Sequence, residues 1–208
     1  MDAAPHASAT PNPPAGSPAA PAGIVELICG CMFSGKTTRL LELLRPEPPD
    51  AVLVVKHAKD ARYSHSRVVT HTGAGQPAVT VTCPTDIRAH VTPTTRVVAI
   101  DEGHFYADDL PDVCAQLAAD GRRVIITALD RDMWGRPFPV VERLRAIAGA
   151  VQIQHAICAA CRQPATHTYR KTPIVGRNLV GGSADFEPRC PQCWSPPPEP
   201  PIDSAEME

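Results

Sequence analysis

The sequence predicts an α/β protein in which a mostly parallel β-sheet is flanked by helices and followed by a small cysteine-rich domain. Short apolar segments of strand length alternate with amphipathic segments through residues 24–155, an order that favours a parallel sheet covered on both faces. A loop with two glycines joins the first such strand to the first helix. Two pairs of closely spaced cysteines follow in residues 156–194, and they predict a small domain that metal binding stabilises.

Six apolar segments are expected to form strands, because each is short and bounded by polar or turn-forming residues: 24–29, 51–55, 79–82, 96–100, 123–128 and 151–154. Three segments with apolar residues at helical spacing are expected to form helices: 38–45, 110–119 and 140–148. Pro46 ends the first helix, because proline lacks the N–H that a helix interior requires. Gly121 is expected to close the second.

Both ends of the chain differ in composition from the predicted folded part. Residues 1–23 are rich in alanine, proline and serine, and residues 195–208 are rich in proline and glutamate. Segments of this kind bury too little apolar surface to offset the entropy lost on ordering. We therefore expect two disordered tails around a domain at 24–155 and a smaller domain at 156–194.

The overall composition disfavours several classes of function and location. A net charge of −2 over 208 residues gives little electrostatic attraction for nucleic acid or an anionic membrane. No apolar run approaches the roughly 20 residues that span a bilayer, and residues 1–23 do not have the pattern of a secretory signal. Eight cysteines, four of them scattered, favour a reducing cytoplasm with a metal site over a disulfide framework.

Residues 30–37 read Gly-Cys-Met-Phe-Ser-Gly-Lys-Thr and satisfy the phosphate-loop pattern. The glycines let the backbone turn several N–H groups inward on a polyphosphate. The lysine adds positive charge at the outer phosphates, and the threonine hydroxyl is a ligand for Mg²⁺. Strand, loop and helix follow in the order that points the helix N-terminus at the phosphates. The residues predicted to bind ATP are Gly30, Cys31, Met32, Phe33, Ser34, Gly35, Lys36 and Thr37.

The apolar segment 96–100 ends on two acidic residues, Asp101 and Glu102. Carboxylates at the end of a buried strand are energetically unfavourable unless a bound ion, a ligand or a reaction requires them. In a phosphate-loop protein they serve magnesium and the reacting hydroxyl or water, and adjacent strand residues point in opposite directions. We therefore expect Asp101 to hold the metal and Glu102 to handle a proton. The alternative is a helix N-terminus that carries acids in its first turn.

A charged segment, residues 56–63, follows the second predicted strand. Open α/β sheets place ligands where strands end, so this segment is a candidate for contact with the phosphates. Its pattern alone, however, favours a solvated surface turn, because loops with many charged residues usually lie at the surface.

Cys158 and Cys161 form one C-x-x-C pair, and Cys190 and Cys193 form a second. Four thiolates in two such pairs suit tetrahedral zinc, and this zinc is structural, because four protein ligands leave no position for a substrate. A redox dithiol would explain one pair but not both. The glycine-containing segment 172–189 is then a long loop anchored by the metal, whose backbone groups are suited to reading the edge of a nucleobase.

Several stretches in order along residues 24–194 resemble the type II thymidine kinases, the family of the human cytosolic and bacterial enzymes. They are the phosphate loop, Lys-Asp-Ala-Arg-Tyr-Ser at 59–64, Asp-Glu-Gly-His-Phe at 101–105, Ala-Leu-Asp at 128–130, Arg-Pro-Phe at 136–138, Val-Gly-Gly at 180–182 and the two C-x-x-C pairs. The resemblance implies a phosphate-loop ATP-binding domain and a zinc domain whose lasso loop closes over the nucleoside. It implies ATP- and Mg²⁺-dependent phosphorylation of the 5′-hydroxyl of thymidine or deoxyuridine. It also implies a homotetramer and feedback inhibition by thymidine triphosphate.

The resemblance assigns roles to individual residues. Glu102 matches the general base and Asp101 the residue that holds magnesium. Positions that match contacts near the nucleotide are Asp60, Arg62, Gly103 and His104. Positions that match the pocket around the thymine ring are Met32, Phe105, Leu129 and Met133. Positions that match the part of the lasso domain enclosing the base are Thr168, Arg177, Asn178, Leu179, Val180, Gly181 and Phe186.

The sequence departs from the family pattern at four positions: His104 replaces glutamine, Phe186 tyrosine, Met133 an aromatic residue and Cys31 a proline. The first three leave open a deoxynucleoside kinase with an altered base preference. A second alternative is a zinc-ribbon module that binds nucleic acid on an inactive phosphate-loop fold, because five Lys/Arg accompany only two acidic residues in 158–194. That alternative leaves the two acids at the strand end unexplained.

Overall fold

A computed structural model of the chain describes residues 23–60, 67–69, 75–172 and 181–198. Its centre is a six-stranded sheet in which every neighbouring pair of strands is parallel. The order across the sheet is β5-β2-β6-β7-β1-β8, with β1 (Val25–Gly30), β2 (Val52–His57), β5 (Val79–Val81), β6 (Val97–Asp101), β7 (Arg123–Ala128) and β8 (Ala150–Gln154). The predicted parallel sheet is confirmed.

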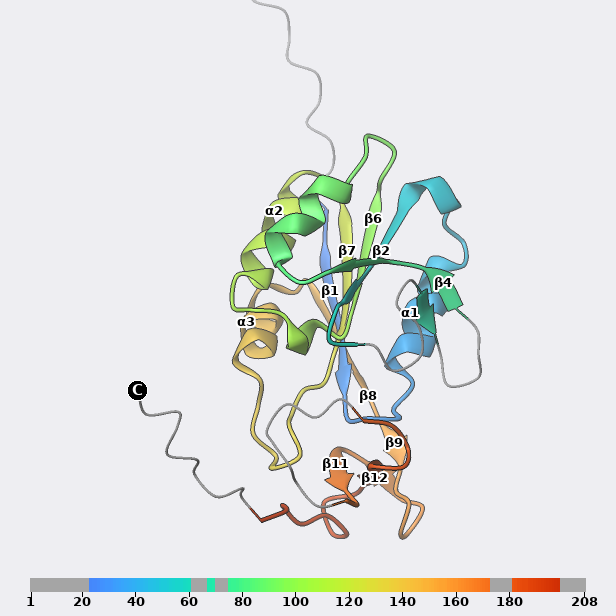
Figure 1. Cartoon of the computed structure of the whole chain (residues 1–208), viewed down its shortest axis with the longest axis vertical. Helices are drawn as coiled ribbons and strands as arrows, with labels where there is room; N and C mark the ends of the chain where they lie inside the picture. Colours follow the sequence, from blue (N-terminus) through green and yellow to red (C-terminus); the bar gives the residue numbers. More distant parts are fainter. Residues whose placement is uncertain (1–22, 61–66, 70–74, 173–180, 199–208) are drawn as a thin grey trace, which may run out of the picture.

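Three helices cover the two faces of the sheet (Figure 1): α1 (Lys36–Leu44), α2 (Leu110–Ala119) and α3 (Pro139–Ile147). On one face, Leu40 and Leu44 of α1 are buried against Ile28 of β1 and Ile125 of β7. α2 and α3 pack together on the other face. All three predicted helices are present, and α1 begins two residues earlier than its pattern predicts, because the phosphate loop runs directly into it.

Leu40 is fully buried between α1 and the sheet. Leu40→Ala is expected to lower the free energy of unfolding by about 2–5 kcal/mol, because it removes buried methyl groups and leaves a cavity. Urea unfolding followed by circular dichroism measures the change. Thr38→Ala, at an exposed position of the same helix, is the control and should shift the free energy by no more than about 0.5 kcal/mol. Equal effects of the two substitutions would contradict this packing.

Short elements join the main strands and helices. Two strands, β3 (Arg67–Val69) and β4 (Gly75–Pro77), pair in antiparallel fashion beside β2. Three 3₁₀ helices are η1 (Pro49–Ala51), η2 (Pro84–His90) and η3 (Gly103–Phe105). None of these five elements was predicted, because hydrophobic periodicity needs a longer window than most of them provide.

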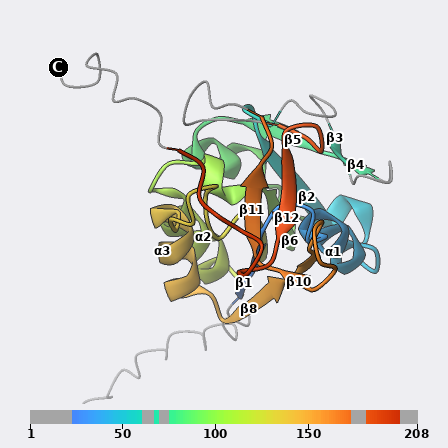
Figure 2. The same ribbon diagram turned by 90° about the horizontal axis from the view of Figure 1, so that it is seen from below.

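The cysteine-rich domain contains two antiparallel strand pairs: β9 (Ala156–Ile157) with β10 (Pro164–Ala165), and β11 (His167–Arg170) with β12 (Phe186–Arg189). It follows β8 almost directly along the chain. The views in Figure 1 and Figure 2 place it at the end of the sheet where β1 runs into the phosphate loop. The two parts of the chain therefore meet at the carboxyl ends of strands, where α/β proteins bind ligands.

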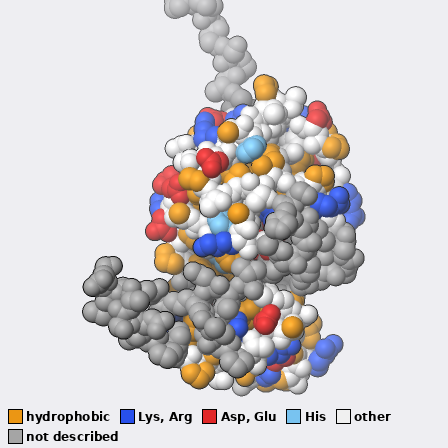
Figure 3. All heavy atoms as spheres, in the orientation of Figure 1, with side chains coloured by type: hydrophobic (Ala, Val, Ile, Leu, Met, Phe, Trp, Pro, Cys, Tyr) orange, Lys and Arg blue, Asp and Glu red, His pale blue; other side chains and the backbone are white. Residues whose placement is uncertain are grey.

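Acidic and basic side chains are interspersed on the face of the molecule shown in Figure 3, and the described residues on this face form no extended basic surface. Within the described ranges, no helix is long and apolar enough to cross a membrane. The two terminal segments expected to be disordered fall mainly on residues 1–22 and 199–208, outside the described residues. Their disorder stays a prediction, as does the domain boundary near residue 155.

Candidate active site

The phosphate loop follows β1 and bends at three residues with positive φ: Gly30 (147°), Phe33 (63°) and Gly35 (83°). A Cβ atom at Gly30 would lie 2.1 Å from the backbone oxygen of Gln154, so only glycine lets β1 turn this close to β8. Phe33 adopts a conformation that is unfavourable for a non-glycine residue by about 1–2 kcal/mol. The loop leads into the N-terminus of α1, which no described side chain caps, so its N–H groups suit an anion.

Lys36 begins α1 and exposes only 7% of its surface. Its Nζ donates a hydrogen bond of 2.8 Å to the backbone oxygen of Cys31, which holds the ammonium group against the loop. A buried charge is unfavourable unless an opposite charge or a hydrogen-bond acceptor compensates it. This position therefore suits a lysine that neutralises the charge of a bound polyphosphate.

The acidic end of β6 lies beside the phosphate loop. The Thr37 hydroxyl is 3.4 Å from Oδ1 and 3.5 Å from Oδ2 of Asp101, to which it donates. Asp101 is buried. Magnesium prefers oxygen ligands such as hydroxyls and carboxylates, so these two side chains fit a shared Mg²⁺ ion. The sequence places Thr37 and Asp101 far apart, and the fold brings them together.

Glu102 follows β6 in the left-handed region of backbone conformation, with φ 56° and ψ 48°. The bend carries the chain into η3 and brings Oε2 of Glu102 within 3.5 Å of Nδ1 of His104. The Glu102 side chain makes no capping hydrogen bond to η3, which argues against the alternative that these acids merely serve a helix N-terminus. A buried carboxylate beside a phosphate loop fits the predicted role in proton transfer.

Asp101 and Glu102 share a hydrogen-bond partner that motif matching missed. Thr127 of β7 is fully buried. Its hydroxyl accepts a hydrogen bond of 3.1 Å from the backbone N–H of Glu102 and donates one to Oδ1 of Asp101. The sequence does contain a signal, since threonine is the one polar residue in the apolar segment 124–128 and a buried hydroxyl needs partners.

His104 connects the acidic strand end with the loop after β7. Its Nδ1 accepts a hydrogen bond of 3.2 Å from the backbone N–H of Leu129, so a neutral His104 carries its proton on Nε2. Its ring centre lies 4.2 Å from that of Phe105 and 5.0 Å from that of Phe138. His104 is predicted to lie near the nucleotide, and in the fold it also positions Leu129. Neighbouring Gly103 is buried, and a Cβ there would lie 2.7 Å from Cγ2 of Ile126.

The charged segment after β2 begins with buried residues, contrary to the surface turn that its pattern favours. Lys56, His57 and Asp60 are all buried. Lys56 Nζ lies 3.4 Å from Oδ2 of Asp60 and donates to the backbone oxygen of Arg67 at 3.5 Å. The register pairs Lys56 with Asp101, so this ion pair lies beside the acidic strand end. The surface-turn interpretation is wrong for these three residues. β2 extends two residues further than predicted, to His57, and the buried charges of Lys56 and Asp60 compensate each other in an ion pair.

Burial lowers the pKa of His57, whose ring lies edge-on to that of Tyr106 at 4.7 Å. The unfolded chain therefore binds a proton here more readily than the folded chain does. We expect the free energy of unfolding to decrease as the pH falls below about 6.5. Urea unfolding between about pH 5.5 and 7.5 measures the slope, which His57→Gln should flatten. The control His90→Gln, at an exposed position, should keep the slope, and an equal slope in all three proteins would contradict this assignment.

An apolar cluster beside the phosphate loop contains Met32, Met133 and Phe186, with Leu129 packed against it. These four residues come from three segments of the chain, the phosphate loop, the loop after β7 and β12, and all are predicted to surround or enclose the base. A Cβ at Gly181 would lie 2.7 Å from the ring of Phe186, so glycine allows the backbone to approach this ring closely. The fold thus gathers five of the predicted substrate-binding residues in one place.

Phe105 does not join this apolar cluster. Its ring lies against His104 and 6.0 Å from that of His57. Five other predicted site residues lie outside the described part of the chain, and their roles stay predictions: Arg62, Arg177, Asn178, Leu179 and Val180.

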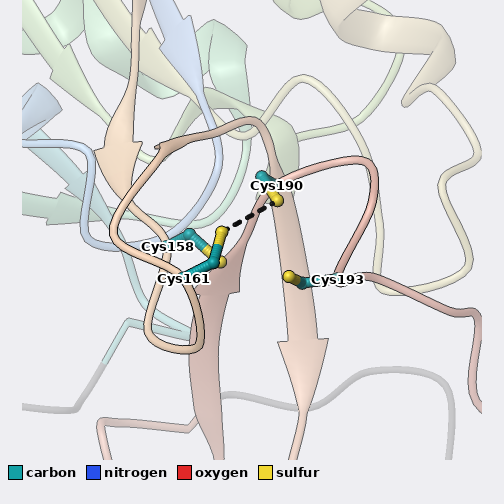
Figure 4. A group of neighbouring side chains, drawn as sticks. All are labelled: Cys158, Cys161, Cys190 and Cys193. Atoms are coloured by element: carbon teal, nitrogen blue, oxygen red, sulfur yellow. Dashed lines mark hydrogen bonds between the residues drawn. The ribbon is translucent and has the colours of Figure 1, made fainter.

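The four paired cysteines converge at the base of the small domain (Figure 4). Their sulfur atoms all lie within 4.8 Å of one another, and those of Cys161 and Cys190 are 3.5 Å apart. Tetrahedral zinc with Zn–S bonds of about 2.3 Å requires sulfur–sulfur distances of about 3.8 Å, so this donor set fits zinc. None of the eight cysteines, all of which lie within the described ranges, forms a disulfide.

The surroundings favour the thiolate form at one cysteine of each pair: the pKa is lowered at Cys158 and Cys190, whereas hydrogen bonds among the neighbouring sulfurs raise the pKa of Cys161 and Cys193. Burial opposes the ionisation of Cys158, but backbone N–H groups of Cys190, Cys161 and Ala160 donate to its sulfur and lower the pKa to about 6. A thiolate, not a thiol, is the metal ligand. The small domain therefore presents a prepared anionic ligand in the position that the two C-x-x-C pairs predict.

The cysteine-rich domain contacts the phosphate loop directly. Cys31 of the loop packs in one buried cluster with Cys158 and Ala165, and its thiol donates to the backbone oxygen of Ala165 at 3.5 Å. Burial raises the pKa of this thiol, so it stays protonated. The next residue, Met32, donates its backbone N–H to Oγ1 of Thr168 at 3.1 Å. Thr168, predicted to lie near the base, thus also supports the phosphate loop.

A parallel sheet, a glycine loop at a helix N-terminus and a Thr–Asp pair suited to Mg²⁺ define a P-loop nucleotide-binding protein. A model of the thymidine kinase family matches residues 23–194. The thymidine kinase of Rhodothermus sp. (strain ITI 518) is 41% identical over 177 residues, which cover 84% of this chain and 83% of that protein. The chain belongs to the thymidine kinase family, and the resemblance carried by its motifs is confirmed.

Solved structures add little to this identification. The X-ray structure of the Legionella pneumophila ATPase DotB is similar over 62% of this chain and 35% of that chain, with 15% sequence identity and a TM-score of 0.38. A likeness this distant supports no conclusion about the site. The assignment therefore rests on the family match and on the site itself.

Proposed function

We propose that this chain transfers the γ-phosphoryl group of ATP to the 5′-hydroxyl of thymidine, and of deoxyuridine, and so supplies a monophosphate for DNA synthesis by nucleotide salvage. Its membership of the thymidine kinase family supports this reaction class. The observation that carries the proposal is the approach of Thr37 to within 3.4 Å of Asp101. It joins the acidic strand end to the phosphate loop, where a phosphoryl group would be transferred.

Phosphoryl transfer needs mainly positioning and the neutralisation of charge. The N–H groups of residues 30–37 and the ammonium group of Lys36 would hold the phosphates of ATP. Thr37 and Asp101 would hold Mg²⁺, which neutralises phosphate charge when bound. Asp60 lies beside this site through its pairing with Lys56, and Arg62 is proposed to contact the phosphates.

Glu102 is the proposed general base. It would accept the proton of the 5′-hydroxyl as that oxygen bonds to phosphorus, a role that typically contributes about 10²–10⁴-fold to the rate. Its left-handed backbone conformation and its position after Asp101 support a specialised role, because strained residues of this kind cluster at functional sites.

The apolar cluster of Met32, Leu129, Met133 and Phe186 is the proposed pocket for the thymine ring. Apolar side chains suit the ring faces and the 5-methyl group, and a few polar groups then fix orientation. The proposed polar contacts come from the backbone of the lasso segment: Arg177, Asn178, Leu179, Val180 and Gly181. Thr168 and Phe105 are proposed to complete the enclosure.

An altered base preference is a competing activity that can be tested directly. Met133 and Phe186 depart from the family pattern, and both lie in the apolar cluster. A panel of radiolabelled nucleosides with ATP separates the two activities. Thymidine and deoxyuridine should be the best substrates, and a preferred purine would end the thymidine assignment.

We propose no nucleic-acid partner. Both signs of charge are mixed over the described surface of Figure 3, whereas nucleic-acid binding needs a basic surface. A gel shift with single-stranded DNA at low salt should show no complex. A salt-dependent complex would instead support the zinc-ribbon alternative.

A homotetramer in the cytoplasm is the proposed state of assembly, with feedback inhibition by thymidine triphosphate. β8 is an edge strand of the sheet, and Val151, Ile153 and Ile157 on and after it expose 39%, 56% and 54% of their surfaces. Exposed apolar residues along an edge strand, one side of which has no neighbouring strand, favour association. Light scattering after size-exclusion chromatography measures the assembly, and a monomer at all concentrations would contradict it.

The most direct test of the proposed function is ADP release by the purified chain with ATP and Mg²⁺, in the presence and absence of thymidine. Thymidine-dependent release is expected, with thymidine monophosphate as the second product. Equal release with and without thymidine would overturn the proposal.

A further inference from the structure

We propose that Thr127 is a positioning residue that fixes both acids of the active site through one hydroxyl group. This inference rests on the roles proposed above for Asp101 and Glu102. Thr127 lies on β7, the strand next to β6 in the sheet, and reaches both residues at the carboxyl end of that strand.

The chemistry of a hydroxyl makes this contact specific. It has one hydrogen to donate and two lone pairs that accept. The hydrogen goes to Oδ1 of Asp101, and a lone pair accepts the N–H of Glu102 at 3.1 Å. The side chain is fully buried, so water does not substitute for either partner. The one hydrogen of the Thr127 hydroxyl is therefore directed at an oxygen of the proposed magnesium ligand Asp101.

Packing alone does not explain a threonine at this position. The flanking residues Ile125, Ile126 and Ala128 are fully buried in the apolar core, where valine fills the same volume without a polar atom to desolvate. A buried hydroxyl in such a strand is unfavourable unless its hydrogen bonds offset the loss of its hydration. Here both bonds go to the residues proposed to carry out the chemistry.

The bond to Glu102 holds an unfavourable backbone conformation. Glu102 is one of three described non-glycine residues with positive φ, and such residues persist only where their surroundings hold them. Thr127 accepts the N–H of Glu102, and the carbonyl of Glu102 accepts the N–H of Phe105 at 3.0 Å. The peptide groups on both sides of Glu102 are thus restrained, and the direction of its side chain follows from them.

The bond to Asp101 acts in the same way on the proposed magnesium ligand. The carboxylate of Asp101 lies between Thr127 of β7 and Thr37 at the start of α1. Without the Thr127 hydroxyl, one of these two restraints is lost and the carboxylate gains rotational freedom. Affinity for Mg²⁺ should then fall, because a metal site requires its ligands to be held in place.

Thr127→Val tests this role, because it keeps the shape of the side chain and removes the hydroxyl. We expect kcat to fall by about 10–100-fold and the Mg²⁺ concentration for half-maximal activity to rise by about tenfold, since a hydrogen bond to a charged group is lost. KM for thymidine should change by less than about threefold, because the base pocket is untouched. Calorimetric titration of Mg²⁺ into the chain with ADP should show the same loss of affinity without turnover.

Thr127→Ser is the matched control, since it restores the hydroxyl and removes only the methyl group. It should recover kcat and Mg²⁺ affinity to within about threefold of the unmodified chain, even where thermal stability falls. If Thr127→Val does not fold, Thr127→Ala removes the same hydroxyl from a smaller side chain. Thermal melts identify the folded variants before any kinetic comparison.

Two results would overturn the inference in distinguishable ways. Unchanged kcat and Mg²⁺ affinity in folded Thr127→Val, with thymidine-dependent activity in the unmodified chain, would reduce Thr127 to a structural residue. Loss of both in Thr127→Ser as well as in Thr127→Val would show that packing, not the hydroxyl, is responsible. Absence of thymidine-dependent ADP release in the unmodified chain would instead remove the proposed function on which the inference rests.

Discussion

Replacement of Glu102 by glutamine is expected to lower kcat by about 10²–10⁴-fold, the usual contribution of a general base. Glutamine has nearly the same shape and keeps the hydrogen-bonding carbonyl, but it does not accept the proton of the 5′-hydroxyl. The backbone conformation at this position should survive, because both side chains are unbranched at Cβ and face the same steric limits. Affinities for ATP and thymidine should stay within about threefold, because a base acts chiefly in the transition state.

Steady-state ADP release measures kcat, and calorimetric titration measures the two affinities. Glu142→Gln is a matched control, since Glu142 lies on α3 with about half of its side chain exposed and pairs with Arg145. An exposed pair of this kind contributes less than about 1 kcal/mol, so its loss should leave turnover unchanged. Unchanged turnover in Glu102→Gln would reject Glu102 as the base, and loss of ATP binding would indicate a structural role instead.

The parts of the site that the sequence predicts well are those in which local chemistry is distinctive. The glycine loop occurs at one junction between a strand and a helix, and the two acids terminate one apolar strand. Parallel strands with their carboxyl ends at one edge then require the loop and the acids to meet, as Thr37 and Asp101 do. The cysteine cluster is predictable for a similar reason, because two C-x-x-C pairs in one small domain are typical of the four ligands of a single zinc ion.

The parts that the sequence does not predict depend on contacts between distant segments. A charged stretch usually indicates an exposed surface segment. Only the fold shows that Lys56 and Asp60 are buried and neutralise each other's charge in an ion pair. Thr168 resembles a residue that contacts the base, yet its hydroxyl accepts an N–H from the phosphate loop more than a hundred residues away. Thr127 belongs to no motif. Hydrogen bonds between side chains on different strands leave no periodic signal for a sequence pattern to detect.

Loss of the metal is the second change for which we expect a large effect. Cys190→Ser removes one of the four converging sulfur ligands. Structural zinc in small domains contributes about 10–16 kcal/mol of binding free energy, and much of it is folding free energy. The variant should therefore contain far less than one zinc per chain and lose the ordered structure of the β9–β12 domain. Elemental analysis measures the zinc content, and thermal melting measures the stability.

The same substitution should also weaken the binding of ATP, although no cysteine of the cluster belongs to the phosphate loop. Cys31 packs on Cys158 and Ala165, and Met32 donates its N–H to Thr168, so the loop is supported by a domain that the metal holds together. Loss of one such buried hydrogen bond and the packing around it corresponds to about a tenfold weaker affinity. Titration of an ATP analogue measures this change.

Two further variants separate the effect of the metal from the effect of the contact. Cys83→Ser changes an exposed cysteine outside the cluster and should keep zinc content, stability and ATP affinity. Cys31→Ala should keep one zinc per chain but weaken ATP binding, because it removes the buried side chain that joins the loop to the small domain. Full ATP affinity in a zinc-free Cys190→Ser variant would show that the phosphate loop keeps its shape without the metal-bound domain.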